Sequence, residues 1–254
     1  MRTAYARCMS MNTWAIYSLK GGVGKTAAAV NLAYEAACAG EHVLLWDLDP
    51  QGAASWYLGV DDQPDLSIKK ILAGKTPLGR EVRSTGHERL SILPGSHGYR
   101  HWDTQIHEAA QPRKVLEQLI APFSETHTLL VLDCPPGIGS LATAILRAAN
   151  RVLVPVVPTP LSLRALDDVL AHVDDKKVGR TQVCPFFSMA DRRRRLHRDL
   201  IESPPKSMAN APEPFVDYSS DVEKMGQHRQ PVAVFAPRSR AAAQYRALYQ
   251  ALAG

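Results

Sequence analysis

Short apolar runs rich in branched side chains recur along the chain and alternate with segments of helical periodicity. The runs have the length of buried strands and lie at residues 14–17, 43–46, 90–93, 129–132, 152–157 and 183–187. The helical patterns cover residues 26–39, 112–120, 141–149, 161–173 and 238–252. This alternation predicts an α/β fold with a mostly parallel, twisted sheet and helices on both faces.

The whole chain is predicted to form a single domain. Its 254 residues, 45% of them hydrophobic, suffice for one large core. The proline-rich residues 203–214 form too short a segment to separate two domains. No pattern precedes the first strand, so residues 1–12 are expected to be a flexible tail before a domain at 13–254, with Met9 or Met11 as alternative starts.

Cysteine use and hydropathy indicate a cytoplasmic protein. The four cysteines stand far apart, which fits free thiols better than a metal site or a disulfide framework. No apolar run reaches the roughly 20 residues needed to span a bilayer, and the first residues lack the apolar core of a secretory signal. The formal net charge of +5 is modest for a DNA-binding protein, so the placement of charge matters more than its total.

Residues 20–26, Lys-Gly-Gly-Val-Gly-Lys-Thr, follow the first predicted strand and open the first predicted helix, a context typical of a phosphate-binding loop. A glycine-rich turn that only caps the helix is the alternative. Leu19 stands where the regular motif has its first glycine, whereas the variant that begins with Lys20 fits completely. Lys25 would neutralise the outer phosphates and Thr26 would offer a hydroxyl to Mg²⁺. The predicted nucleotide-binding residues are Lys20, Gly21, Gly22, Val23, Gly24, Lys25, Thr26 and Ala27.

Three acidic residues follow predicted strands. Asp47 and Asp49 end the second apolar run, and Asp133 ends the run at 129–132. The carboxyl ends of parallel strands meet at one sheet edge, so these acids are expected beside the phosphate loop. Asp47, Asp133 and Thr26 are the predicted Mg²⁺ site, and Asp49 is predicted to orient the attacking water. Capping of a helix by Asp49 before Pro50 is the alternative for that acid.

The strongest concentration of charge is a run of arginines that would fit within about two helical turns. Such a run is typical of a phosphate-binding surface, and equally of a solvated helix face. Its members, the candidate DNA contacts, are Arg192, Arg193, Arg194, Arg195 and Arg198.

Taken together, residues 20–26, 47–52 and 133–137 resemble the three nucleotide motifs of the ParA/MinD family of deviant Walker ATPases, over nearly the whole chain. The resemblance implies a single-domain P-loop fold, ATP and Mg²⁺ as cofactors, and slow ATP hydrolysis. It further implies that Lys20 reaches across an ATP-dependent homodimer to the partner's nucleotide, that Asp49 supports hydrolysis and that Asp133 serves the metal. Lys20, Lys25 and Asp49 are the expected catalytic residues. Relatives commonly have a second threonine or serine where this chain has Ala27, so weaker nucleotide affinity is expected.

The ParA branch of the family fits the arginine run, because the corresponding stretch of ParA proteins contributes to nonspecific DNA binding by the ATP dimer. This branch implies a nucleoid-associated protein whose hydrolysis is stimulated by a ParB-like or cargo-adaptor partner. The cargo implied is a plasmid, a chromosome region or a protein assembly.

Two alternatives belong to other branches of the same fold. MinD relatives bind membranes through a C-terminal amphipathic helix; here Tyr245, Leu248, Tyr249 and Leu252 share one helical face with few cations nearby, so packing onto the domain is expected and membrane binding is not. The second alternative is a metabolic ligase that uses ATP to form an amide or a ring. Lys20 and the arginine run have no evident use in that chemistry.

Overall fold

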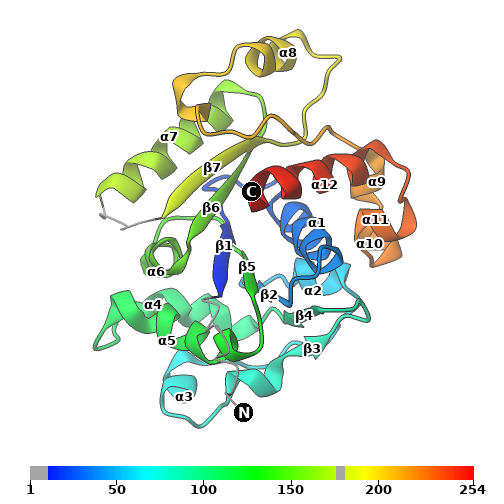
Figure 1. Ribbon diagram of the computed structural model, residues 1–254. Helices are drawn as coiled ribbons and strands as arrows, with labels where there is room; N and C mark the ends of the chain where they lie inside the picture. The colour runs from blue at the N-terminus through cyan, green and yellow to red at the C-terminus, as the bar shows by residue number, and fades with distance from the viewer. Residues whose placement is uncertain (1–10, 176–180) are drawn as a thin grey trace, which may run out of the picture.

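The computed structural model describes residues 11–175 and 181–254, which form one sheet covered by helices (Figure 1). The sheet order is β3-β4-β2-β5-β1-β6-β7, and all neighbouring strands are parallel except the β3–β4 pair. The strands are β1 (Asn12–Ile16), β2 (Val43–Asp47), β3 (Arg83–Ser84), β4 (Leu90–Leu93), β5 (Leu129–Asp133), β6 (Arg151–Val156) and β7 (Gln182–Phe187). The predicted fold class is confirmed, and the strand order places β1 centrally, between β5 and β6.

Helices cover both faces of the sheet, as the sequence predicts. The five predicted helices are present, although the one expected at 112–120 begins with a 3-10 turn at Pro112–Lys114. The helices are α1 (Lys25–Cys38), α2 (Ala53–Tyr57), α3 (Ile68–Leu72), α4 (Trp102–His107), α5 (Val115–Ile120), α6 (Ser140–Ala148), α7 (Pro160–Asp175), α8 (Arg195–Glu202), α9 (Ser220–Glu223), α10 (Met225–His228), α11 (Val232–Phe235) and α12 (Arg240–Ala253).

Each face of the sheet has its own hydrophobic core. On one face, the alanine-rich side of α1 and the buried face of α12 pack against alternate residues of the central strands. On the other, residues of α4, α5, α6 and α7 form a second core with alternate strand residues, and this core includes the packed aromatic side chains of Trp46 and Trp102. Since strand residues on both faces are buried, the strands read as continuous apolar runs in the sequence.

Two sequence expectations need correction at element boundaries. β1 already begins at Asn12, one residue inside the predicted tail; residues 1–10 lie outside the described residues. The arginine run does not lie within two turns of one helix, because α8 begins only at Arg195. The turn before this helix contains Arg192, Arg193 and Arg194. In it, Oδ1 of Asp191 accepts a hydrogen bond from the backbone N–H of Arg193 (3.1 Å).

The C-terminal helix packs onto the domain, as predicted. Tyr245, Leu248, Tyr249 and Leu252 of α12 are all buried against α1 and the sheet. Within the described residues, no helix has the length and apolar character required to cross a membrane.

Candidate nucleotide site

Three adjacent strands deliver the candidate residues to one sheet edge. β5 lies between β1 and β2, and Asp133 is in register with Ile16 of β1 and with Asp47 of β2. The loop that leaves β1 therefore passes beside both acids before α1 begins. This arrangement confirms the expectation that the phosphate loop and the acids share an edge.

The backbone of the phosphate loop depends on its glycines. Gly22 and Gly24 have φ of +70° and +90°, in the left-handed region that favours glycine. A Cβ at Gly24 would also lie 2.9 Å from Oγ of Ser188, which follows β7. The loop thus has both the conformation and the close approach to a neighbouring strand that require glycine at position 24.

The two lysines of the loop point to different places. Lys25 is buried, and its Nζ donates to the carbonyl of Lys20 (3.2 Å), across the inside of the loop. Burial lowers the pKa of Lys25, while the nearby acids Asp133 and Asp49 oppose that change. Lys20 instead directs its Nζ to Oγ of Ser162 (3.4 Å), near the start of α7. Lys25 is therefore placed to meet phosphates, and Lys20 lies at the outer side of the loop.

Asp133 has the environment of a group that awaits a cation. Both of its carboxylate oxygens are buried, and neither has a hydrogen-bond partner of normal geometry among the described residues. Burial raises the pKa of Asp133 well above its ordinary value; Asp47 adds to the rise, and the Thr26 hydroxyl and Lys25 oppose it. Unpaired buried carboxylate oxygens are costly. A hard cation such as Mg²⁺, which prefers oxygen ligands, fits this position, with Thr26 as the neighbouring hydroxyl.

Asp47 is a different kind of acid. Its Oδ2 accepts hydrogen bonds from the backbone N–H (2.9 Å) and the hydroxyl (2.8 Å) of Ser55 in α2. Its Oδ1 accepts a longer one from the backbone N–H of Asp49 (3.2 Å). Burial raises the pKa of Asp47 to about 6, against the lowering effect of these bonds. Because both oxygens are engaged, Asp47 holds the shape of the following turn, and metal ligation by this residue remains a prediction.

Asp49 lies half-exposed at the opening of the site. Its Oδ1 accepts from the backbone N–H of Gln51 (2.9 Å), so this acid also makes a local turn. The helix that follows begins only at Ala53, after Gly52, and therefore Asp49 does not cap it. Its Oδ2 makes no hydrogen bond with the described residues, so it is available to orient water.

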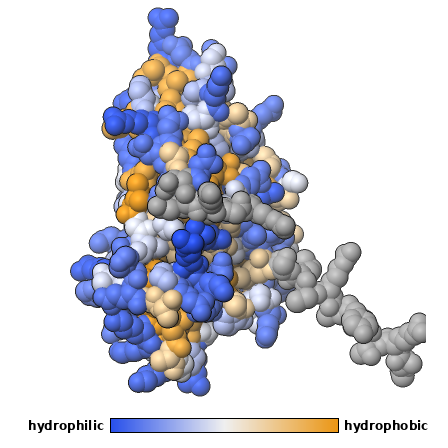
Figure 2. Space-filling model, turned by 90° about the vertical axis from the view of Figure 1, so that its left-hand side faces the viewer, coloured by the Kyte–Doolittle hydropathy of each residue, from blue (hydrophilic) through white to orange (hydrophobic). Residues whose placement is uncertain are grey.

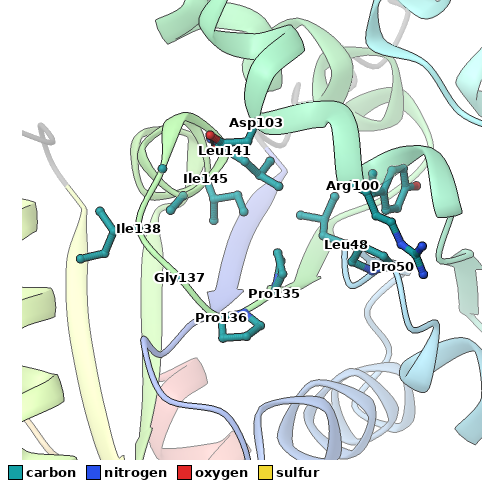
Figure 3. A pocket seen from close by; sticks show the side chains of 13 residues that line it. Leu48, Pro50, Arg100, Asp103, Pro135, Pro136, Gly137, Ile138, Leu141 and Ile145 are labelled. Atoms are coloured by element: carbon teal, nitrogen blue, oxygen red, sulfur yellow. Dashed lines mark hydrogen bonds between the residues drawn. The ribbon is translucent and has the colours of Figure 1, made fainter.

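The segment after Asp133 lies over a hollow in the surface (Figure 3). The hydroxyl of Tyr17 donates to the carbonyl of Gly137 (2.7 Å), and Oδ1 of Asp103 accepts from the backbone N–H of Leu141 (3.0 Å). Between these anchors, Ile138 is 60% exposed. Beneath the segment is a cavity of about 290 Å³, which Leu48, Pro135 and Ile145 help to line.

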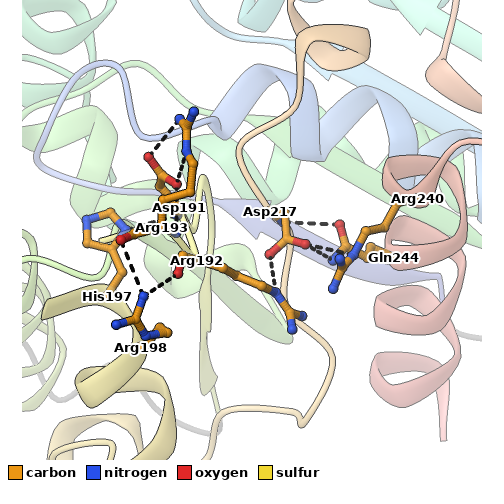
Figure 4. A network of polar contacts seen from close by, with 8 residues as sticks. All are labelled: Asp191, Arg192, Arg193, His197, Arg198, Asp217, Arg240 and Gln244. Carbon is orange, nitrogen blue, oxygen red and sulfur yellow. Dashed lines mark hydrogen bonds and ion pairs between the residues drawn. The ribbon is translucent and has the colours of Figure 1, made fainter. Parts of the chain in front are cut away.

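The arginine run lies at the end of the molecule where α8 is found (Figure 1), and Figure 4 shows Arg192, Arg193 and Arg198 of this run. Arg193 and Arg195 have 85% and 88% of their side chains exposed, and Arg194 is also exposed. In Figure 2 the upper end of the molecule, where α8 lies, carries hydrophilic residues with hydrophobic ones between them. The structure thus places the predicted arginines close together and exposed at this end of the molecule.

Several of these arginines already have partners. Arg192 contacts Asp217 (Nε–Oδ1 3.1 Å), which also pairs with Arg240 of α12. Arg193 forms two hydrogen bonds with Asp191. Arg198 donates to the backbone carbonyls of Arg192 (2.8 Å) and Arg193 (3.3 Å). Arg194 and Arg195 make only longer ion pairs, of 3.7 and 3.6 Å, so they are the most available for phosphates.

Sequence reasoning missed the residues that orient the site from a distance. Ser55 holds Asp47, Tyr17 and Asp103 hold the segment after Asp133, and Ser162 contacts Lys20. None of them lies in a recognisable motif. Only the strand-end position of Tyr17, directly before the phosphate loop, is a signal that sequence could have supplied.

The chain matches a protein-family model and is similar to several known proteins. A family model described as an AAA domain matches residues 11–182. The chromosome-partitioning ATPase Soj of Treponema pallidum is 32% identical over 187 residues, which cover 72% of this chain and 73% of that protein. The ATP complex of a Cyanothece McdA variant superposes with a TM-score of 0.81 at 20% identity, over 96% of this chain and 97% of the other. Cobyrinic acid a,c-diamide synthase from Mycobacterium smegmatis, solved with ADP and magnesium, gives 0.78 at 23% identity, over 96% and 94%.

A strand, a glycine-rich loop with a buried lysine, and strand-end acids together define the class of P-loop nucleotide-binding proteins. The chain belongs within that class to the ParA/MinD-like ATPases. The family that the motifs suggested is therefore confirmed.

Proposed function

We propose that this protein is a nucleotide-switched positioning ATPase of the ParA type. ATP and Mg²⁺ close two copies into a homodimer, the dimer binds DNA without regard to sequence, and slow hydrolysis releases it. A ParB-like or cargo-adaptor partner accelerates hydrolysis, and the protein works in the cytoplasm on the nucleoid. The observation that carries the proposal is that the loop and the arginine turn are neighbours. Ser188 and Met189 line one cavity together with Gly24, and the arginine turn starts two residues later.

The site supports the roles proposed for its residues. Lys25 and residues 21–27 bind the phosphates, and Thr26 and Asp133 hold Mg²⁺, which supplies charge neutralisation at the outer phosphates. Asp49, with one carboxylate oxygen outside its local turn, orients the attacking water. Since the nearest polar contact of the Lys20 ammonium is Ser162 rather than its own loop, Lys20 can turn outward to a nucleotide held by a second copy.

Exposed apolar side chains near Lys20 favour a protein partner on this face. Leu161, 62% exposed, precedes Ser162, and Ile138 stands out from the segment after Asp133. Exposed apolar residues rimmed by polar ones are typical of interaction surfaces. A second copy that meets Lys20 would cover this region.

Direct binding of the protein to random-sequence duplex DNA, with ATP, ADP or no nucleotide, tests the proposal. The Arg194→Glu/Arg195→Glu variant should lose ATP-dependent, salt-sensitive binding, because charge reversal repels phosphates. A matched control, Lys70→Glu/Lys75→Glu, carries the same change in net charge at α3 and the turn after it, at the opposite end of the molecule from α8 (Figure 1), and should bind normally. Binding to anionic vesicles instead of DNA would favour a MinD-like role.

The ligase alternative rests on one observation, the 290 Å³ cavity beside the segment after Asp133, together with a fold shared with an ATP-using synthase. It requires a carboxylate substrate in that cavity. Loss of both DNA and vesicle binding, with saturable binding of a small carboxylate, would place this candidate first.

A further inference from the structure

Ser188 presents an unused hydroxyl to the nucleotide site. It is 2% exposed, and its Oγ makes no hydrogen bond to any described residue, although its backbone N–H is fixed to the carbonyl of Val156 (2.9 Å). That bond continues the β6–β7 pairing and fixes where the residue lies. Because Ser188 lines a cavity beside the loop, a ligand atom held there can be the partner of this hydroxyl.

The position of Ser188 indicates which part of a bound nucleotide its hydroxyl would meet. Together with Gly22, Gly24 and Ala27, it lines a cavity of about 230 Å³ on the flank of α1. None of the residues that would meet the γ-phosphate or the metal, namely Lys20, Asp49 and Asp133, lines this cavity. Because the loop cradles the phosphates between these two sides, the cavity lies on the side of the α-phosphate and the ribose.

We propose that Ser188 is a nucleotide-binding residue whose hydroxyl donates a hydrogen bond to the α-phosphate. Ala27, in the first turn of α1, lines the same cavity and has no side-chain donor. The hydroxyl of Ser188, directly after β7, supplies a donor on the other side of this cavity. The inference rests on nucleotide binding at this loop and not on DNA binding or dimerisation.

Titration calorimetry with Mg·ADP and with a Mg²⁺ complex of a nonhydrolysable ATP analogue tests the assignment. Ser188→Ala should weaken both nucleotides by the same factor, about tenfold, the size expected for one hydrogen bond to a charged group. Ser188→Thr keeps the hydroxyl and should bind within about twofold of the wild type. Retention by threonine separates the lost hydrogen bond from a general disturbance of the fold.

The neighbouring position provides a second, independent readout. Ala27→Thr adds a donor in the same cavity and should tighten both nucleotides, and in that background Ser188→Ala should cost clearly less than in the wild type. Ser84→Ala, at the exposed edge strand β3, is the matched control and should change nothing.

Two results would overturn the assignment. One is wild-type affinity of Ser188→Ala for both nucleotides; the other is a loss confined to the ATP analogue, which would place the hydroxyl at the γ-phosphate. Failure of nucleotide binding itself is recognised separately. The wild type would then bind as weakly as Lys25→Ala.

Discussion

Asp47 and Asp133 are neighbours across the β2–β5 pair, yet their surroundings assign them different tasks. Asp47 accepts hydrogen bonds at both oxygens and shapes the turn that carries Asp49. Asp133 has buried oxygens without hydrogen-bond partners among the described residues. A buried charge of that kind destabilises the fold until a cation neutralises it, so we expect Asp133 to serve binding rather than stability.

The Asp133→Asn substitution separates these two effects. An amide removes the buried charge, so the melting temperature without Mg²⁺ should stay the same or rise. ATP turnover with Mg²⁺ should fall by at least about a hundredfold, because the metal loses its charged partner. Differential scanning fluorimetry and a phosphate-release assay measure the two quantities. Asp199→Asn, an exposed acid of α8, is the control, and wild-type turnover in Asp133→Asn would remove this residue from the metal site.

The protonation state of His197 is expected to affect the stability of the arginine turn. Its Nδ1 accepts from the backbone N–H of Asp191 (3.0 Å), and its buried Nε2 has no partner among the described residues. Burial lowers the pKa of His197, and Arg194 adds to this effect, while Asp191 opposes it. The folded protein thus favours the neutral ring. Its stabilising effect is complete above the ordinary pKa of about 6.5 and decreases as the pH falls below that value.

The pH dependence of chemical denaturation tests this role. Between pH 7.5 and 5, the wild type should lose free energy of unfolding more steeply than His197→Asn, whose amide oxygen can accept the same hydrogen bond without titrating. Other histidines, such as His87 and His127, contribute equally to both proteins and cancel in the comparison. Parallel curves for the two proteins would contradict the role given to His197.

At the scale of elements, helices and strands with a clear apolar period could be predicted from the sequence, and very short helices could not. The central strands and the five predicted helices follow from apolar periodicity, and Gly40 ends α1 with a φ of +102°, as a helix-terminating glycine should. Helices of four or five residues, such as α9 and α11, are too short to show a period, and tertiary contacts decide them.

The arginine run shows why spacing alone misled. Five arginines within seven positions look like one helical face, but Asp191 turns the chain before α8. Asp191 bonds to Arg193, which lowers the pKa of Asp191 to about 2. Arg192 is also held by Asp217, which is distant in sequence, and this contact could not be read from the spacing of the arginines.

Arg195 and Arg198 should therefore respond differently to alanine substitution. Arg195→Ala should reduce the salt dependence of DNA binding by about one unit of slope and leave the melting temperature unchanged, since its ion pair is exposed. Arg198→Ala removes two hydrogen bonds to backbone carbonyls and should lower the melting temperature, at a cost of about 1 kcal/mol. Equal melting temperatures for the two variants would contradict a positioning role for Arg198.

The C-terminal helix is a structural element, and its substitution should show this. Leu248 is fully buried between α12 and α1, so Leu248→Ala should cost about 2–5 kcal/mol of unfolding free energy. Gln250→Ala, on the exposed side of the same helix, should be neutral. Denaturant unfolding followed by circular dichroism measures both. A neutral Leu248→Ala would mean that the helix is not packed as described.

At the scale of the whole molecule, the strand order explains why the candidate site residues lie at one edge of the sheet. β1, β2 and β5 end side by side, so the phosphate loop, Asp49 and Asp133 meet although they are far apart in sequence. The loop and the acids could be predicted because parallel strands end together. Ser162 and Ser188 could not, because contacts that only folding creates bring a lone serine to the loop.

In the proposed switch, ATP closes two copies through Lys20. Sedimentation velocity of Asp49→Ala with Mg·ATP, compared with the Lys20→Gln/Asp49→Ala double variant, tests this closure. Asp49→Ala should accumulate a dimer because it binds ATP without hydrolysing it, and the double variant should stay monomeric while it still binds ATP. A double variant that dimerises like Asp49→Ala, or an Asp49→Ala protein that remains monomeric with ATP bound, would contradict the account.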